Sequence, residues 1–198
     1  NVYVAFSSEQ FKNADNRQPT SDKDIRFSIE IANDEYKESE DSELYDIAKR
    51  IYDSGATSKK AYYKLSETLP ERLVNDIKEI LNIDVSDYGN EISETSIAHI
   101  NRRHGPNGIS DHSMEDVHNV ARIEYAIENY AEIEEGARSK EYRNRDGSYS
   151  KTIVMRANIG SDFYYVVEAV PDAKIKTLHV VSAYINKNDT FSDVVVSN

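Results

Sequence analysis

The 198-residue chain has no cysteine and no run of 18 apolar residues. Without cysteine, neither a disulfide framework nor a thiolate zinc site can form. Without a long apolar run, no transmembrane helix is predicted, and the start Asn1 to Val4 lacks the basic and apolar regions of a signal peptide. Since the chain begins with Asn1 rather than methionine, we interpret it as part of a longer protein.

Positive charge is also scarce, because 24 Lys and Arg stand against 36 Asp and Glu, a net charge of −12. This balance argues against general duplex-DNA binding, since affinity for the phosphate backbone comes mainly from basic side chains. Residues 1–95 hold 12 basic and 21 acidic side chains, whereas residues 96–198 hold 12 and 15. We therefore expect any anion-binding surface in the second half.

The first part of the chain is predicted to precede the main domain and to contain no catalytic residues. Residues 1–33 indicate the tail of a preceding domain and a linker, because a short alternating segment is followed by polar turn formers. Residues 34–82 indicate an acidic linker and a helical segment. The main domain is predicted over residues 83–198.

Within residues 34–82, three helices are predicted from apolar residues at helical spacing. The first spans Leu44 to about Asp53 before Gly55, the second Ser58 to Thr68, and the third begins at Pro70. The tyrosines of the second helix, Tyr62 and Tyr63, are interpreted as core residues rather than as a base-stacking surface.

The main domain is predicted to contain two helices followed by strands. The first helix is capped by Thr95 or Ser96 and ends at about His104, before Gly105-Pro106-Asn107-Gly108; the second is long and runs from Ser113 to Tyr130. Three strands with turn signals between them follow at residues 151–159, 163–170 and 175–185. These elements predict an α+β fold in which two helices pack on a small antiparallel sheet, after the preceding helical segment.

Alternation along the strands separates two faces of this sheet. In the first strand Ile153, Met155 and Ala157 share one face, and Arg156 lies on the other. In the last strand the same rule places Leu178, Val180, Ser182 and Tyr184 together. A sheet packed on helices can present polar groups on its other face. The candidate site residues on these strands are Lys151, Arg156, Glu168, Ser182 and Tyr184.

The most informative local motif is His99-Ile100-Asn101-Arg102-Arg103-His104-Gly105. It combines a proton-transfer group with guanidinium groups that suit phosphate, although a basic last turn also complements the helix dipole. His99 and His104 are five positions apart and no carboxylate triad lies nearby, so we predict a site without metal. His179 is interpreted as a strand-surface residue. No P-loop, dinucleotide-binding, Gly-x-Ser-x-Gly or EF-hand motif occurs.

Several motifs occur in one order along residues 83–187. They are His99-Ile100, Arg103-His104-Gly105, Arg122 to Tyr130, Tyr142-Arg143-Asn144, Asp146-Gly147, Tyr164 to Asp172, and Val180 to Tyr184. In this order they resemble the phage barnase/EndoU/colicin/RelE-like nuclease group. Members of this group lie at the C-termini of phage-head morphogenesis and polyvalent proteins of prophages. The opening residues up to Ser28 are similar to the tail of a preceding domain in such proteins.

The resemblance implies a compact fold, two helices followed by a four-stranded antiparallel sheet, and RNA cleavage without a metal ion or other bound cofactor. The ribose 2′-hydroxyl would attack the adjacent phosphate while an acid/base pair moves the protons. Carried over by motif, His104 would be the leading acid/base, with His99 and Arg103 beside it and with Ser182 and Tyr184 on the last strand. Lys151 and Arg156 are expected phosphate contacts by charge and position.

The sequence leaves a main hypothesis and two alternatives. The main one is a metal-independent endoribonuclease acting on tRNA or other RNA, a prophage toxin or effector with an immunity or antitoxin protein as partner and no membrane role. It would act in the bacterial cytoplasm of the target or host cell, or travel in a phage particle. The alternatives are a catalytically decayed protein-binding module and a DNase. The decayed module is considered because residues 157–160 lack a basic pair that family members often have.

Overall fold

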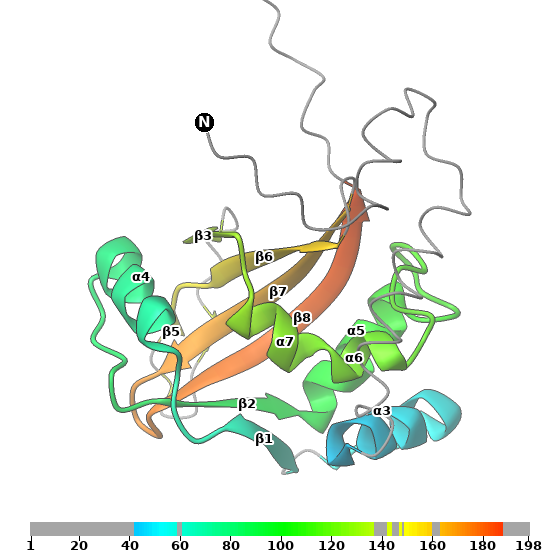
Figure 1. Ribbon diagram of the computed structural model, residues 1–198. Helices are drawn as coiled ribbons and strands as arrows, with labels where there is room; N and C mark the ends of the chain where they lie inside the picture. Colours follow the sequence, from blue (N-terminus) through cyan, green and yellow to red (C-terminus); the bar gives the residue numbers. More distant parts are fainter. Residues whose placement is uncertain are drawn as a thin grey trace, which may run out of the picture.

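A computed structural model describes residues 42–58, 61–136, 142–143, 147, 149–159 and 163–187 (Figure 1). The helices of this part are α3 (Glu43–Ser54), α4 (Glu71–Leu81), α5 (Glu94–His104), α6 (His118–Ala121) and α7 (Ile123–Glu128). Its main sheet contains β1 (Tyr62–Ser66), β2 (Gly89–Ser93), β3 (Glu132–Glu135), β6 (Ile153–Ile159), β7 (Phe163–Asp172) and β8 (Thr177–Lys187). Two further strands, β4 (Tyr142–Arg143) and β5 (Tyr149–Ser150), pair with each other. None of the described helices is long and apolar enough to cross a membrane.

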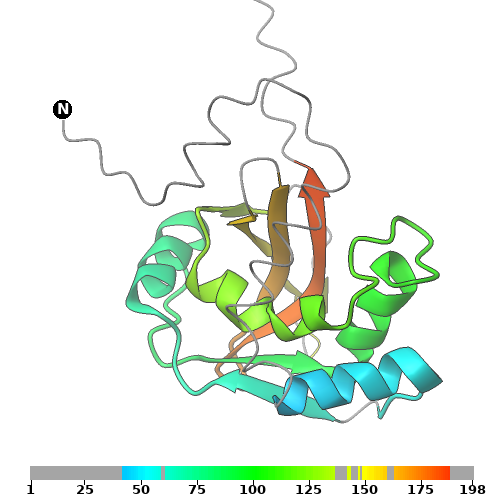
Figure 2. The ribbon, with the colours of Figure 1, turned by 45° about the vertical axis from the view of Figure 1, so that its right-hand side comes forward.

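The main sheet has the strand order β1-β2-β8-β7-β6-β3 and confirms the α+β class. It differs from the predicted antiparallel sheet in two ways. The described sheet has six strands, because β1, β2 and β3 join the three predicted from the sequence, and β2 runs parallel to β8, with Gly89 opposite Thr177. A parallel pair needs a long crossover, and here the crossover contains all the residues between β2 and β8. α5 therefore starts at the end of β2 and lies beside β8 (Figures 1 and 2).

Helices α3 and α4 confirm two of the predicted helices. In α3 the Ser42 side chain accepts a hydrogen bond from the Tyr45 amide, and Gly55 ends the helix at φ 66°, which glycine adopts without strain. The apolar stripe of each helix is buried, as Leu44 in α3 and Leu73 in α4 show. α5 is also present, but it begins slightly earlier than predicted, with Ser93 as its cap.

The predicted helix over Ser58 to Thr68 is wrong, because this segment contains strand β1, which pairs with β2. Adjacent tyrosines suit a strand, and pairing with β2 outweighs the weak helical spacing. Tyr62 is 42 % exposed, so it is not a core residue, whereas Tyr63 packs against the core.

The predicted long helix from Ser113 to Tyr130 is also wrong. A loop extends past Ser113, and two short helices, α6 and α7, follow it with a break at Arg122. At that break the backbone has φ −86° and ψ 0°, outside the α-helical basin. The apolar residues recur at helical spacing, as predicted, but they belong to two short helices separated by the break at Arg122.

One hydrophobic core joins the described helices to the strands of the main sheet. It includes Leu44 of α3, Leu65 of β1 and Leu73 of α4 together with the residues of β6, β7 and β8. Ile153, Met155 and Ala157 are buried on one face of β6, as predicted, and α7 packs against β6 and β7. The opposite face of β6 to β8 is left for the pocket. Residues 1–33 lie outside the described residues, and the predicted division of the chain into domains stays a prediction.

Candidate active site

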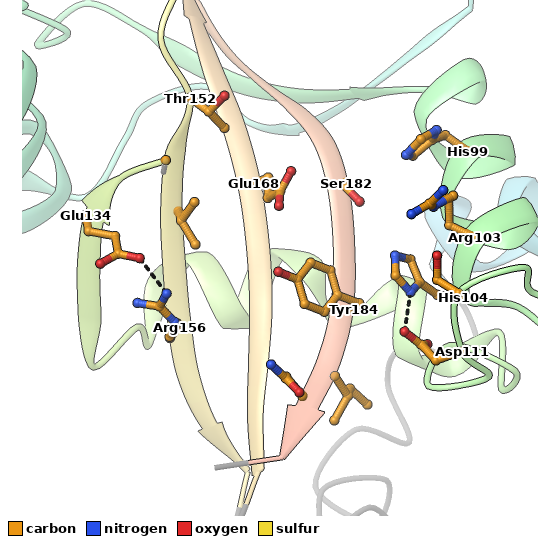
Figure 3. Close-up of a pocket in the computed structure, with 15 residues that line it drawn as sticks. His99, Arg103, His104, Asp111, Glu134, Thr152, Arg156, Glu168, Ser182 and Tyr184 are labelled. Carbon is orange, nitrogen blue, oxygen red and sulfur yellow. Dashed lines mark hydrogen bonds and ion pairs between the residues drawn. The ribbon is translucent and has the colours of Figure 1, made fainter. Parts of the chain in front are cut away.

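A cavity of about 600 Å³ lies between α5 and the sheet face that the core does not use (Figure 3). From α5 and the loop after it, the lining includes His99, Arg103, His104, Ser110 and Asp111. From the strands it includes Glu134, Thr152, Arg156, Glu168, Ser182 and Tyr184. The structure thus brings together all the predicted site residues except Lys151, which lies outside the lining.

An irregularity in β8 decides which of its side chains reach the pocket. Ser182 pairs with Glu168, but the next residue of β7, Ala169, pairs with Val180, so β8 carries an extra residue between the two pairs. Such a bulge inverts the alternation of side chains. The predicted common face of the last strand is therefore wrong. Of its four residues, Leu178 and Val180 are buried in the core, whereas Ser182 and Tyr184 line the pocket.

His104 is the best-defined side chain in the pocket. It lies in the last turn of α5, it is 8 % exposed, and its Nδ1 atom is 2.8 Å from Oδ2 of Asp111. Asp111 reaches this position because the loop after α5 turns back on the helix. Its other carboxylate oxygen accepts a hydrogen bond of 2.9 Å from the Ser113 amide.

Two glycines allow the loop to turn so tightly. A Cβ atom on Gly105 would lie 2.2 Å from Oδ1 of Asn101, and one on Gly108 would lie 2.1 Å from the Asp111 carbonyl oxygen. No Cβ atom fits at such distances, so the backbone itself requires glycine at Gly108. The turn predicted at residues 105–108 is therefore the feature that brings Asp111 back to His104.

The Asp111 contact fixes the protonation pattern of His104. Burial raises the pKa of the Asp111 carboxyl, but hydrogen bonds from Ser113 and His104 outweigh it, so that the pKa is lower than the ordinary value. A carboxylate can only accept, so Nδ1 of His104 carries the proton and donates it to Asp111. When His104 is neutral, its lone pair is on Nε2, the nitrogen on the far side of the ring from Asp111 (Figure 3).

Tyr184 packs flat against His104. The two ring centroids are 5.0 Å apart, and the rings are inclined by only 20°. Together with Asp111, this stacking contact restricts the imidazole on its face and at its edge. The ring is therefore held in one orientation before any ligand arrives, as an acid or base requires.

His99 lies one and a half turns before His104 and has the opposite tautomer. Its Nδ1 atom is 3.1 Å from the Arg102 guanidinium, which can only donate, so neutral His99 carries its proton on Nε2. Burial lowers the pKa of His99, and the neighbouring charges of Arg102 and Arg103 lower it further. His99 thus contributes a neutral hydrogen-bond donor to the pocket rather than a positive charge.

The cations around the pocket differ in their partners. Arg156 donates to Glu134 at 2.5 Å and lies 3.8 Å from Glu132, and the Glu134 hydrogen bond, against the opposing effect of burial, raises its pKa. Lys151 forms an ion pair of 2.7 Å with Glu135. In contrast, no Asp or Glu of the described residues pairs with Arg103.

The floor of the pocket is polar and largely buried. Glu168 and Ser182 are paired residues of β7 and β8, and Thr152 directly precedes β6. Ser182 is 5 % exposed and Thr152 is 4 % exposed. Sequence reasoning missed Thr152, Glu134 and Asp111, since no motif marks them. The one available signal is strand alternation, because Thr152 is four residues before Arg156 and so shares its face.

His179 lies in strand β8, where the sequence predicts a strand-surface residue rather than a catalytic one, and its side chain is partly buried. It lies outside the pocket lining, 3.4 Å from Ser96 and 3.4 Å from Glu91 on the parallel strand β2. Its side chain is 21 % exposed. Among the described residues, no group of three or more His, Asp or Glu side chains is placed to hold a metal ion.

These features define an α+β protein with a pocket in which a fixed histidine and an arginine of α5 face an arginine and carboxylates of the sheet, an arrangement that suits a nuclease. The comparison with family models makes this specific. The chain belongs to the phage-Barnase-EndoU-ColicinE5/D-RelE like nuclease3 family, whose model matches residues 70–192. No match was found among curated proteins or among solved structures.

Proposed function

We propose that this nuclease is an endoribonuclease that needs no metal ion and cleaves tRNA or another RNA through the ribose 2′-hydroxyl. One observation carries the proposal. The imidazole of His104, oriented by Asp111 and Tyr184, shares a single cavity with the carboxylate of Glu168 and the guanidinium of Arg103. These are the groups that an internal phosphoryl transfer requires.

The reaction needs one group to take a proton and one to give it. The 2′-oxygen bonds to the adjacent phosphorus, the bond from phosphorus to the 5′-oxygen breaks, and the products are a 2′,3′-cyclic phosphate and a 5′-hydroxyl. In the proposed mechanism Glu168 accepts the proton of the 2′-hydroxyl. Protonated His104, whose positive charge Asp111 stabilises, gives its Nε2 proton to the leaving 5′-oxygen.

Charge develops on the phosphate as the new bond forms, and a cation must offset it. Arg103 is suited to this role because it lines the cavity one residue before His104 and no described acid pairs with it. The hydroxyls of Ser182 and Tyr184 offer further hydrogen bonds to phosphate oxygens. Since only one wall of the cavity has to be basic, the net charge of −12 is compatible with an RNA substrate.

The test is cleavage of total tRNA in EDTA by the wild-type chain and by His104→Gln. We expect discrete cuts ending in 2′,3′-cyclic phosphate, reduced by a factor on the order of 100 or more in the variant. His112→Gln is the matched control, because His112 is exposed and lies outside the cavity lining. Thermal melting of both variants shows whether each is folded.

Three other results would reject parts of the proposal. Cuts that require a divalent ion would reject the metal-free mechanism, and cleavage of DNA of the same sequence would reject attack by the 2′-hydroxyl. If folded wild-type protein left every tRNA intact, a protein-binding role would replace the enzymatic one.

We further propose that the nuclease is a prophage toxin or effector with an immunity protein as partner.

A further inference from the structure

The wall of the pocket opposite α5 is built by an acidic edge strand. β3 has only four residues, three of which are Glu132, Glu134 and Glu135, and in the described sheet it pairs with β6 alone. Glu134 lines the cavity and its side chain is 51 % exposed. A strand held by one short ladder thus brings the carboxylate of Glu134 to a cavity that we have assigned to a phosphate-containing substrate.

The Glu134 carboxylate pairs with Arg156, which is the cation that this wall would offer to the substrate. The Arg156 guanidinium is 2.5 Å from Glu134, and its other terminal nitrogen is 3.8 Å from Glu132. A carboxylate and a phosphate approach a guanidinium group in the same planar, two-oxygen manner, so the two compete for it. Glu134 therefore occupies the place that a phosphate oxygen would take at Arg156.

The two arginines of the pocket are consequently unequal. A phosphate that enters the cavity meets Arg103 without any described acidic partner, but at Arg156 it meets a guanidinium that already donates a hydrogen bond to Glu134 (Figure 3). We propose that Glu134 is a specificity-determining residue. Its carboxylate takes the place of a phosphate at Arg156, and it thereby weakens the binding of RNA molecules that do not also contact the α5 wall. This inference rests on the proposed function.

The expected size of the effect is modest, because the ion pair is partly exposed. Exposed pairs contribute little, so that releasing Arg156 by Glu134→Gln should tighten RNA binding about two- to fivefold. The same change should reduce discrimination between substrate and unrelated RNA. Both readouts concern binding and do not depend on cleavage.

Fluorescence anisotropy with a 2′-O-methyl RNA oligonucleotide, which cannot be cleaved through its 2′-oxygen, measures this binding. The variants are Glu134→Gln, Arg156→Gln and their combination. Glu135→Gln is the matched control, since Glu135 lies on the same strand and carries the same charge, but pairs with Lys151 outside the cavity. Melting curves of all variants show whether they are folded.

The inference is supported if Glu134→Gln tightens binding more than Glu135→Gln does and if the gain disappears when Arg156 is also Gln. Equal gains from the two glutamate variants would overturn it, as they would reflect overall charge alone. A gain that persists without Arg156, or no binding by any variant, would overturn it as well. Cleavage of tRNA is scored separately, so an active enzyme without this gain refutes only the role of Glu134, and an inactive protein with it refutes only the nuclease mechanism.

Discussion

The two walls of the pocket are held in place by different interactions. The loop on the α5 side is fixed by its backbone, with amides that donate to carbonyls in the last turns of α5; these pairs are Ile109 to Arg102, Ser110 to Arg103, and Met114 to His104. β3 is held to β6 by one short backbone ladder, and the charged side chains on that side form ion pairs, such as Arg156 with Glu134. Backbone bonds position the group that must be accurate, whereas side-chain pairs adjust charge. Substitutions on the α5 wall should accordingly have much larger effects.

Loss of the Asp111 carboxylate is the most severe test of the α5 wall. In Asp111→Asn the tautomer of His104 is no longer fixed and its positive charge is no longer stabilised, so we expect cleavage to fall on the order of 100-fold. Substrate affinity should change much less. The measurement is kcat and KM on a tRNA substrate.

The chain offers a second His–Asp pair as the control for that experiment. His118 Nδ1 lies 2.6 Å from Asp116, outside the cavity lining. Asp116→Asn breaks an equivalent pair and should leave cleavage near the wild-type rate. Equal losses in the two variants would show that the Asp111 effect is structural rather than catalytic.

A methyl group at Gly108 tests whether the backbone of the loop is as constrained as its contacts indicate. The added Cβ would meet backbone atoms of Asp111 and Arg103, which cannot move aside as flexible side chains do. We expect Gly108→Ala to lower the free energy of unfolding by about 2 kcal/mol, as other overpacked sites do. Asn107→Ala, at the exposed neighbouring position, should change it little. Urea unfolding compares the two, and equal stabilities would contradict the tight turn.

His99 makes the α5 wall sensitive to pH. Burial and the nearby arginines lower its pKa below the usual 6.5, so the unfolded chain binds a proton that the folded chain resists. The free energy of unfolding is therefore not reduced by His99 above pH 6.5, where the histidine is neutral in both states. As the pH falls below 6.5, the unfolded chain takes up the proton more readily and stability is lost. We expect His99→Gln to lose less stability than the wild type between pH 7.5 and 5.5.

The measurement for His99 is urea unfolding at both pH values. His112→Gln serves as the control, because it removes an exposed histidine outside the pocket. If the wild type and His99→Gln lost the same stability on acidification, then the pKa of His99 would not be shifted in solution.

On the β3 wall the smallest effect is expected at Lys151. Its ion pair with Glu135 spans 2.7 Å, but the two side chains are 61 % and 39 % exposed. Exposed pairs contribute little after solvent screening, so Lys151→Gln should change the free energy of unfolding by less than about 0.5 kcal/mol. A loss comparable to that of Gly108→Ala would remove the distinction between the two walls.

The parts of the site that could be predicted are those with a local signal. His99, Arg103 and His104 occur in one motif of α5, and alternation placed Arg156 on the pocket face of β6. Asp111 could not be found in this way, since its contact with His104 depends on a loop reversal that only the packing around Gly105 and Gly108 reveals.

The errors in the fold have the same physical origin. β1 and β2 become strands through pairing with each other and with β8, which no local window contains. The bulge in β8 likewise depends on its register with β7, so that alternation failed between Val180 and Ser182. Local periodicity identifies apolar faces, and long-range pairing decides which element presents them.

The parallel pairing of β2 with β8 also bears on how the molecule folds. It joins Gly89 to Thr177, residues 88 positions apart, and α5 follows directly from β2. Closing a loop of this length costs chain entropy before the contacts repay it, which slows folding. Until β8 has docked, Ser182 and Tyr184 have no place beside His104. The onset of cleavage during refolding would therefore report completion of the native topology, after the local helices have formed.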